Sequence, residues 1–333
     1  MRRGRSTRRL AAILALPLWL CALGAGAARG QAAGSPPVSD NATVERLEKQ
    51  VFAFEDRLDR LQIEESELQM ATMKAEWAAA RSLAEPGKAG EQMAKGALSP
   101  ELRRYRDAVL RGVQQWQAFR GRFVRFAATV RPLEHQREGL PPRVRAKINN
   151  LLARVQAKDR SLLVKLANLY EKVAEYRSAM AARMTIYKAM PPDRRAGERA
   201  FTEKIADLAE KCGDYRTALT LIRSVVEARS EKDRYGDKRL GERLGDLYAQ
   251  SGDPGSAFQA YKATFEAIDE KSRYGERGLG EKLGDLCEQS GCLADAMALY
   301  RRLYDAIPED KREQDGAGLA ANIAALERRL GNP

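Results

Sequence analysis

The sequence predicts an all-α protein: an N-terminal coiled-coil helix, a helical middle segment, and a C-terminal α-solenoid of about four helix pairs with a capping helix. Three observations predict this. Hydrophobic residues make up 44% of the chain but aromatic residues only 7%, and Ala, Leu, Arg and Glu dominate, which favours helix over strand. A heptad pattern begins at Val44. A 39-residue period runs through the second half of the chain.

Residues 1–30 have the organisation of a secretory signal peptide. They begin with the cationic stretch MRRGRSTRR, continue through an apolar stretch from Leu10 to Leu23, and end in small residues suited to cleavage. We therefore expect export, with the protein periplasmic or secreted after cleavage. An uncleaved membrane anchor is the alternative. Residues 31–40 are polar and rich in Pro and Gly, and we expect them to form a flexible leader.

Residues 41–85 are predicted to form a coiled coil. Alternating three- and four-residue spacing places one apolar seam along the helix, with Glu65 and Thr72 as polar breaks. The seam consists of Val44, Leu47, Val51, Phe54, Leu58, Leu61 and Leu68. The pattern favours self-association into a dimer or trimer. The alternative is that the helix folds back on the next helices of its own chain. Pro86-Gly87 ends the helix, and residues 86–98 are predicted to be a linker.

Residues 99–160 are predicted to be a basic helical segment, with 15 basic and 5 acidic side chains against 8 and 12 in residues 31–98. Ser99-Pro100-Glu101 is a helix-start signal, and an aromatic stripe follows it. The candidate basic face comprises Arg111, Arg120, Arg122, Arg125, Arg143, Arg145 and Lys147. It could bind an anionic polymer, a lipid surface or an acidic protein. The alternative is a solvated face opposite a core stripe.

Residues 161–333 carry the repeat. Small residues recur at Ala167, Ala206, Gly245 and Gly284, and the turn residues Ala174, Gly213, Gly252 and Gly291 recur at the same 39-residue interval. Two helices per period predict an α-solenoid in which each unit buries its apolar face on its neighbours. The incomplete last unit is predicted to be a cap.

The repeats resemble the tetratricopeptide repeat (TPR) family. The pattern is carried by Leu244-Gly245, Tyr248, Ala257 and Tyr261, with Arg183 in the first unit where an aromatic residue is expected. The resemblance implies that a partner segment binds along the first helix of each repeat. Carried over residue by residue, this partner groove comprises Glu203, Lys204, Asp207, Glu242, Arg243, Asp246, Glu281, Lys282 and Asp285. Its acids favour a basic or mixed-charge segment. The alternative is a set of ion pairs within each helix, three residues apart.

The cysteines give no metal signal. Cys287 and Cys292 could form a local disulfide in an oxidising compartment, or Cys287 could be a small core residue, since Ala209 and Tyr248 occupy its repeat positions. The chain's lone histidine, His135, argues against sites built from several histidines. Recognisable nucleophile, phosphate-loop and metal-ligand motifs are absent from the sequence, so we expect no catalytic residues and no cofactor.

The function expected from sequence is an exported, non-catalytic scaffold that oligomerises through its coiled coil and binds a protein partner in the repeat groove. The order of export signal, coiled coil, linker and repeats resembles the periplasmic cell-division coordinator family of the Tol–Pal envelope machinery. One alternative is binding of an envelope polymer or membrane surface through residues 99–160, with the repeats as a spacer. Another is that this basic segment docks on the acidic groove of its own chain. Nucleic acid is not an expected partner, because the repeats carry as many acids as bases.

Overall fold

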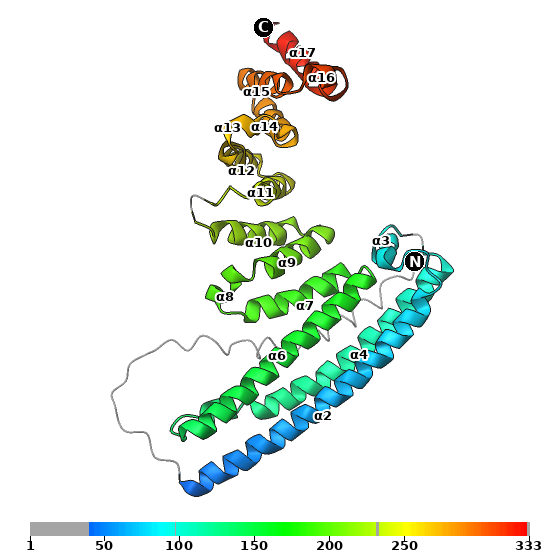
Figure 1. Cartoon of the computed structure of the whole chain (residues 1–333), viewed down its shortest axis with the longest axis vertical. Coiled ribbons are helices and arrows are strands. Elements are labelled where there is room, and N and C mark those ends of the chain that lie inside the picture. The colour runs from blue at the N-terminus through cyan, green and yellow to red at the C-terminus, as the bar shows by residue number, and fades with distance from the viewer. Residues whose placement is uncertain (1–39, 97, 231–232, 332–333) are drawn as a thin grey trace. The chain divides into compact units, whose positions relative to one another are not determined.

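The computed structural model describes residues 40–96, 98–230 and 233–331, and every regular element within these ranges is a helix (Figure 1). The all-α prediction is therefore confirmed. The predicted signal peptide lies outside the described residues, as does the leader up to residue 39. Within the described part, no helix is long and apolar enough to cross a bilayer. The chain divides into two compact units, the first ending at Pro192 and the second beginning at Asp193.

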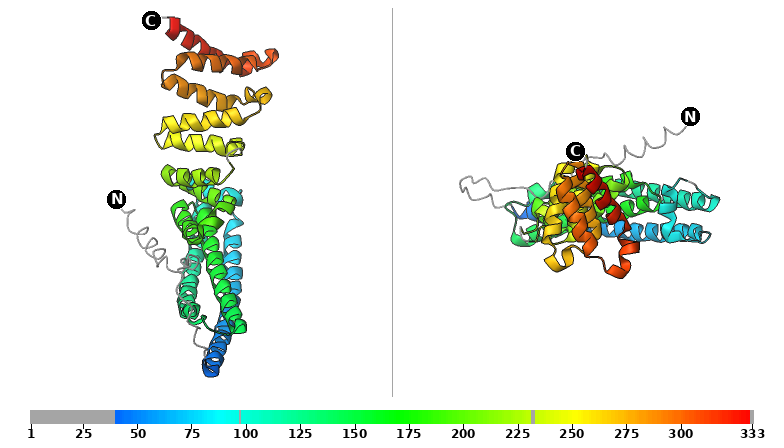
Figure 2. Two further views of the ribbon diagram at one scale, coloured as in Figure 1. Left: turned by 90° about the vertical axis from the view of Figure 1, so that its left-hand side faces the viewer. Right: turned by 90° about the horizontal axis from the view of Figure 1, so that it is seen from above.

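Unit 1 is built on three long helices that lie side by side: α2 (Asn41–Ala80), α4 (Pro100–Val130) and α6 (Pro142–Lys172) (Figures 1 and 2). The short helix α5 (Leu133–Gln136) lies in the connection between α4 and α6, and α7 (Tyr176–Ala189) packs on α6. Phe119, Phe123 and Phe126 of α4 are fully buried in the core. The aromatic stripe of the sequence is therefore core.

The starts of α2 and α4 follow from their cap residues. The Asp40 side chain accepts a hydrogen bond from the Thr43 backbone N–H at 2.8 Å, and the Ser99 hydroxyl accepts one from Leu102 N–H at 3.2 Å. Each satisfies a backbone donor that the first turn of a helix leaves unpaired. Pro100 follows Ser99 at the first helical position, where its missing N–H costs nothing.

The seam of α2 packs inside unit 1. Leu47, Val51, Leu58 and Leu61 are buried, and α2 lies against both α4 and α6. Phe54 contacts the ring of Phe126 edge to face, with centroids 6.1 Å apart. This corrects the predicted use of the seam, because the apolar face that a dimer or trimer would share is already covered by helices of the same chain. The alternative is confirmed: the helix folds back on the next helices of its own chain.

Residues 86–98 also differ from the predicted linker. They contain a 3₁₀ turn (η2, Pro86–Lys88) and α3 (Ala89–Ala94), whose Ala89 and Met93 are buried in a cluster with Leu102 and Tyr105. A Cβ added at Gly90 would lie 2.9 Å from the Glu171 carbonyl oxygen of α6. Gly90 therefore allows α3 to lie close to α6, and the prediction took this glycine as a sign of a linker.

The predicted boundary at residue 160 falls inside α6, which continues unbroken to Lys172. The first repeat pair therefore consists of the last part of α6 together with α7, and both belong to unit 1. In this pair Arg183 is buried and donates to Asn168 Oδ1 at 2.7 Å and to Glu171 Oε1 at 2.9 Å. Arg183 stands at the repeat position that Ile222 takes in the next pair and that Tyr261 and Tyr300 take in the last two pairs.

Unit 2 consists of helix pairs that pack in chain order (Figure 2). The pairs are α9 with α10, α11 with α12, and α14 with α15, while α17 covers α15; α10 also packs on α11, and α12 on α14. The helices after α7 are α8 (Pro192–Gly197), α9 (Arg199–Lys211), α10 (Tyr215–Glu227), α11 (Lys238–Gln250), α12 (Pro254–Ala267), α13 (Glu270–Arg273), α14 (Arg277–Gln289), α15 (Leu293–Asp305), α16 (Glu309–Asp315) and α17 (Ala317–Gly331).

The recurring turn of the sequence is a left-handed residue that ends the first helix of each pair. Gly213, Gly252 and Gly291 have φ of 73°, 85° and 81°, and Ala174 takes the same conformation with φ of 59°. The next backbone N–H then reaches back to the helix, as Asp253 N–H does to the Tyr248 carbonyl at 2.9 Å. Glycine recurs at 39-residue intervals because side chains disfavour this conformation.

Candidate partner-binding face

The first helices of unit 2, α9, α11 and α14, present a row of acids and cations that pair from one repeat to the next. The 39-residue period places equivalent residues of neighbouring repeats on the same side, so that a cation of one repeat reaches the acids of the repeat before it. We call this row the charge ladder, and its cations are Arg243 and Lys282. A hollow lined by Lys238, Arg239, Glu242, Arg243 and Asp246 lies on the same face.

Arg243 forms the first contact of the ladder. Its guanidinium donates to Asp207 Oδ1 at 2.5 Å and to Glu210 Oε1 at 2.6 Å, and its side chain is 17% exposed. Burial disfavours the charged form, but the hydrogen bonds and charges of Glu210 and Asp207 outweigh burial and raise the pKa of Arg243. The guanidinium therefore joins α9 to α11 as a fixed positive charge.

Lys282 repeats this contact one period later. Its ammonium donates to Asp246 Oδ1 at 2.7 Å and to Glu242 Oε1 at 2.8 Å, joining α11 to α14. Here too burial lowers the pKa of Lys282, and the contacts with Asp246 and Glu242 raise it further than burial lowers it. The ammonium lies 5.7 Å from the centroid of the Tyr261 ring.

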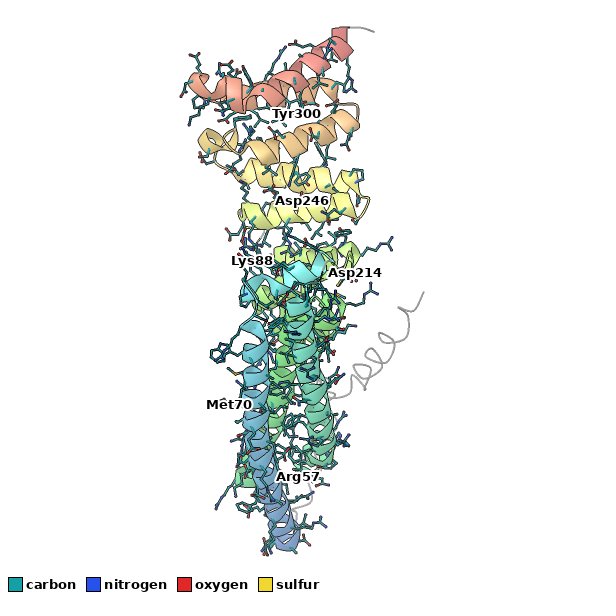
Figure 3. All side chains as sticks on the ribbon, turned by 90° about the vertical axis from the view of Figure 1, so that its right-hand side faces the viewer. Arg57, Met70, Lys88, Asp214, Asp246 and Tyr300 are labelled. Atoms are coloured by element: carbon teal, nitrogen blue, oxygen red, sulfur yellow. The ribbon has the colours of Figure 1, made fainter. Side chains whose placement is uncertain are left out.

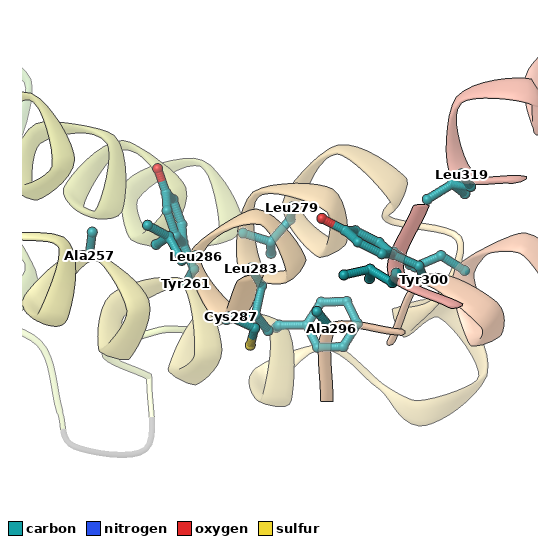
Figure 4. Close-up of a cluster of buried hydrophobic side chains, with 12 residues drawn as sticks. Ala257, Tyr261, Leu279, Leu283, Leu286, Cys287, Ala296, Tyr300 and Leu319 are labelled. Atoms are coloured by element: carbon teal, nitrogen blue, oxygen red, sulfur yellow. The ribbon is translucent and has the colours of Figure 1, made fainter. Parts of the chain in front are cut away.

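Tyrosines of the second helices support the acids of this row. Tyr261 donates its hydroxyl to Asp246 Oδ1 at 2.6 Å, and Tyr300 donates to Asp285 Oδ1 at 2.5 Å. Burial, followed by the neighbouring carboxylate, raises the pKa of each phenol, so both remain hydrogen-bond donors near neutral pH. Figure 4 shows the two rings in the buried cluster together with Cys287, which lies on α14, the helix that pairs with the helix of Tyr300. In the earlier pair, Arg183 reaches Asn168 across the same 15 residues.

The equivalent of Lys282 is missing in the capping helix α17. Adding one period to Arg243 gives Lys282, and adding another gives Ala321, an uncharged side chain, while Arg329 of α17 pairs with Glu288 of α14. Glu281 pairs along its own helix with Arg277 at 3.3 Å, and Asp285 accepts from Tyr300. Within the described residues, Glu281 and Asp285 therefore have no cation from the following helix of the kind that Lys282 supplies to Glu242 and Asp246.

The remaining predicted groove residues are also engaged within the chain. Glu203 accepts from Arg199 at 2.6 Å and from Arg239 of the next repeat at 2.6 Å, and Lys204 is not free either. For Arg243 and Lys282 the alternative predicted from sequence, an ion pair three residues away on the same helix, is wrong. Both cations pair with acids of the preceding repeat. Sequence analysis missed Glu210, Tyr261 and Tyr300 as members of this face. Fixed spacings in the sequence could have identified them: Glu210 and Arg243 are 33 residues apart, and the Tyr and Asp of each Tyr–Asp pair are 15 residues apart.

Removing the guanidinium of Arg243 is expected to destabilise unit 2. In Arg243→Met, Asp207 and Glu210 face each other without their cation, and we expect a loss of about 1–2 kcal/mol in the free energy of unfolding, between the values for exposed and for buried pairs. Urea unfolding measures this. The matched control is Lys262→Met, whose exposed pair with Glu266 at 3.9 Å should contribute less than about 0.5 kcal/mol. Equal losses in the two variants would contradict a structural role for the ladder.

The predicted basic face of residues 99–160 is partly used for packing within unit 1. Arg120 pairs with Asp159 at 2.9 Å, Arg122 with Glu64 at 2.9 Å, and Lys147 with Glu48 at 3.2 Å. The other four members are exposed, namely Arg111, Arg125, Arg143 and Arg145. Acids of α2 thus neutralise Arg122 of α4 and Lys147 of α6, whereas Arg120 pairs with Asp159 of α6. The acidic partner of these three cations is therefore the chain itself.

The cysteines of the described residues form no disulfide: Cys212, Cys287 and Cys292 are not joined to one another. Cys287 is buried in the core cluster, which agrees with its interpretation as a small core residue. Burial raises the pKa of the Cys287 thiol, which disfavours the reactive thiolate. A search of the described residues for groups of three or more side chains able to hold a metal ion finds none.

Comparison with known proteins adds no assignment. No protein-family model matches the chain, and no curated protein matches it.

Proposed function

We propose that the protein is an exported, non-catalytic scaffold whose TPR-like repeats bind a basic or mixed-charge segment of a protein partner along α9, α11 and α14. The observation that carries the proposal is the end of the charge ladder, where Glu281 and Asp285 lack the cation that neighbouring repeats provide. A Lys or Arg of the partner would complete the row in the way that Lys282 does on Glu242 and Asp246.

Two further features support this choice of ligand. Tyr300 holds the Asp285 carboxylate in place, so one acceptor is fixed before the ligand arrives, which reduces the entropy cost of binding. Acids on the same face hold the cations Arg243 and Lys282, so an acidic peptide would have to break existing ion pairs. A basic segment would compete only with Arg277 for Glu281, a pair exposed to solvent, and would otherwise add to the row. The basic face of residues 99–160 is a weaker candidate because α2 already neutralises part of it.

The test compares Glu281→Gln/Asp285→Asn with Glu309→Gln/Asp310→Asn, a pair with the same change in charge at exposed positions of α16. Fluorescence anisotropy would measure binding of a Lys/Arg-rich peptide and of its Glu-rich counterpart. Affinity capture from an extract of the source's envelope would then identify the natural partner. We expect the first variant to bind the basic peptide at least about fivefold more weakly, because one charge-assisted contact contributes about 1 kcal/mol or more.

The control variant should bind as the unmodified protein does, and the acidic peptide should not bind to any of the three. An equal loss of affinity for the basic peptide in both variants would mean that only net charge matters, and it would contradict the proposed site. Binding that survives in Glu281→Gln/Asp285→Asn and is lost only with salt would shift the function to the basic face of unit 1.

A further inference from the structure

Helix α2 exposes a row of large apolar side chains on the side that faces away from its seam. Their exposed fractions are 73% for Phe52, 62% for Ile63, 68% for Met70, 55% for Met73 and 64% for Trp77. Among the described residues, the other exposed large hydrophobic side chains are Tyr215 and Leu330, both in unit 2. Figure 3 shows Met70 on the outer side of the helix. We call these five side chains the α2 stripe.

The stripe runs along one side of the helix, with Phe52 eleven residues before Ile63. Asp59, which pairs with Arg154 of α6, falls in the same sector between them. With 3.6 residues per turn, its five members fall within about 80° of one another, and they extend over about 38 Å at 1.5 Å per residue. Ile63, Met70 and Trp77 recur every seven residues, which is a second heptad opposite the buried one. Five such side chains expose on the order of 600 Å² of apolar surface, near the upper end of what a monomeric protein leaves uncovered.

We propose that the α2 stripe pairs with the stripe of a second copy of this chain, with the two α2 helices antiparallel. This is a different face from the seam that the sequence predicts for self-association, and it does not depend on partner binding by unit 2. Two stripes would bury about 1,200 Å², the lower limit of a stable interface, so we expect a dissociation constant in the range of about 1–100 μM.

Charge decides the orientation. The first half of the stripe is flanked by Glu55, Asp56 and Asp59, and the second half by Lys74 and Arg81. A parallel pair would place the acidic half of each helix beside the acidic half of the other copy, and the basic half beside the basic half, which repels. An antiparallel pair centred between Glu64 and Glu65 instead places Phe52 against Trp77 of the second copy.

In that register the polar flank is also complementary. Asp56 and Lys74 of the two copies lie on the same flank within about 2 Å of each other along the helix axis, and Arg60 and Glu67 within about 3 Å. The two-fold axis doubles both pairs. Glu55 also argues for a second copy over an anionic lipid surface, which its carboxylate would repel.

Sedimentation velocity of the purified protein across 1–200 μM tests the association. We expect a concentration-dependent dimer whose dissociation constant rises at least about tenfold in Met70→Ser/Trp77→Ser. The matched control Leu330→Ser removes another exposed apolar side chain and should change nothing. Circular dichroism melting should leave the midpoint of each variant within about 2 °C, because these side chains are not in the core. A protein that stays monomeric at every concentration, or a double variant that still dimerises, would overturn the proposal.

Charge reversal tests the orientation. Lys74→Glu should weaken the dimer by about three- to tenfold, because Asp56 then faces an acid in both halves of the interface. Adding Asp56→Lys reverses both members of each pair and should restore the dissociation constant to within about twofold. In a parallel pair Asp56 of one copy and Lys74 of the other lie about 27 Å apart along the helix axis. The second reversal would then give no recovery, and that result would contradict the antiparallel arrangement. A blue shift of Trp emission with zwitterionic vesicles, without any dimer, would assign the stripe to a membrane surface instead.

Discussion

Gly245→Ala and Gly284→Ala are each expected to destabilise unit 2 by about 2 kcal/mol. A Cβ at Gly245 would lie 2.3 Å from Tyr261 Cε1, and one at Gly284 would lie 2.3 Å from Tyr300 Cε1. Neither ring can move aside, because both tyrosines are buried and each hydroxyl is held by a carboxylate. The two helices of the pair must separate, and overpacking of this kind costs about 1–3 kcal/mol.

Gly278→Ala is the matched control, because Gly278 lies in the same helix as Gly284 and a Cβ there meets nothing within 4 Å. Alanine has the higher helix propensity, so this variant should be more stable by up to about 1 kcal/mol. Chemical unfolding of the three variants measures the difference. In a Tyr300→Leu background, Gly284→Ala should lose most of its effect, and an undiminished effect would show that the ring is not the obstacle.

The repeat was predictable from sequence because its geometry is local. Gly213, Gly252 and Gly291 mark left-handed turns, and the 39-residue interval alone places them. Gly245 with Tyr261 is a contact within one helix pair, so the family-like spacing also indicated it. The ladder was not predictable in the same way. Arg243 has acids within reach on its own helix and on its neighbour, and only the packing of α11 beside α9 shows that it takes Asp207.

The seam of α2 illustrates a different limit. A heptad pattern identifies which face is buried but not which chain covers it. The polar residues that interrupt the seam indicate that the same chain covers it. Glu65 pairs with Lys158 and Lys165 of α6, and Thr72 accepts a hydrogen bond from the Trp116 indole of α4 at 3.3 Å. The opposite charges of residues 31–98 and 99–160 were a second indication. The structure joins them in pairs such as Asp59 with Arg154 at 2.6 Å.

Replacing both lysines that contact Glu65 is expected to cause the largest loss of stability in unit 1, about 3–5 kcal/mol. The Glu65 side chain is 7% exposed, and its two oxygens accept from Lys158 at 2.5 Å and Lys165 at 2.8 Å. In Lys158→Met/Lys165→Met the carboxylate stays buried without a cation. Adding Glu65→Leu removes the stranded charge and fills the seam, so the triple variant should recover most of the loss. Thermal and urea unfolding measure both steps, and no recovery would contradict the proposed cause.

The same triad predicts how this loss depends on pH. Burial raises the pKa of Glu65, but hydrogen bonds from Lys158 and Lys165 lower it more, so the folded pKa lies below the ordinary value of 4.5. Glu65 therefore stabilises the fold above pH 4.5, and this contribution disappears as the pH falls through the folded pKa. In Lys158→Met/Lys165→Met only burial remains, the folded pKa rises above 4.5, and acid favours the fold by neutralising the carboxyl. The difference in stability between the unmodified protein and Lys158→Met/Lys165→Met should thus shrink steadily from pH 7 to pH 4.

The control is Arg122→Met, which breaks the exposed pair with Glu64 and should show no such trend. A difference that stays constant with pH would mean that the lysines act by packing alone.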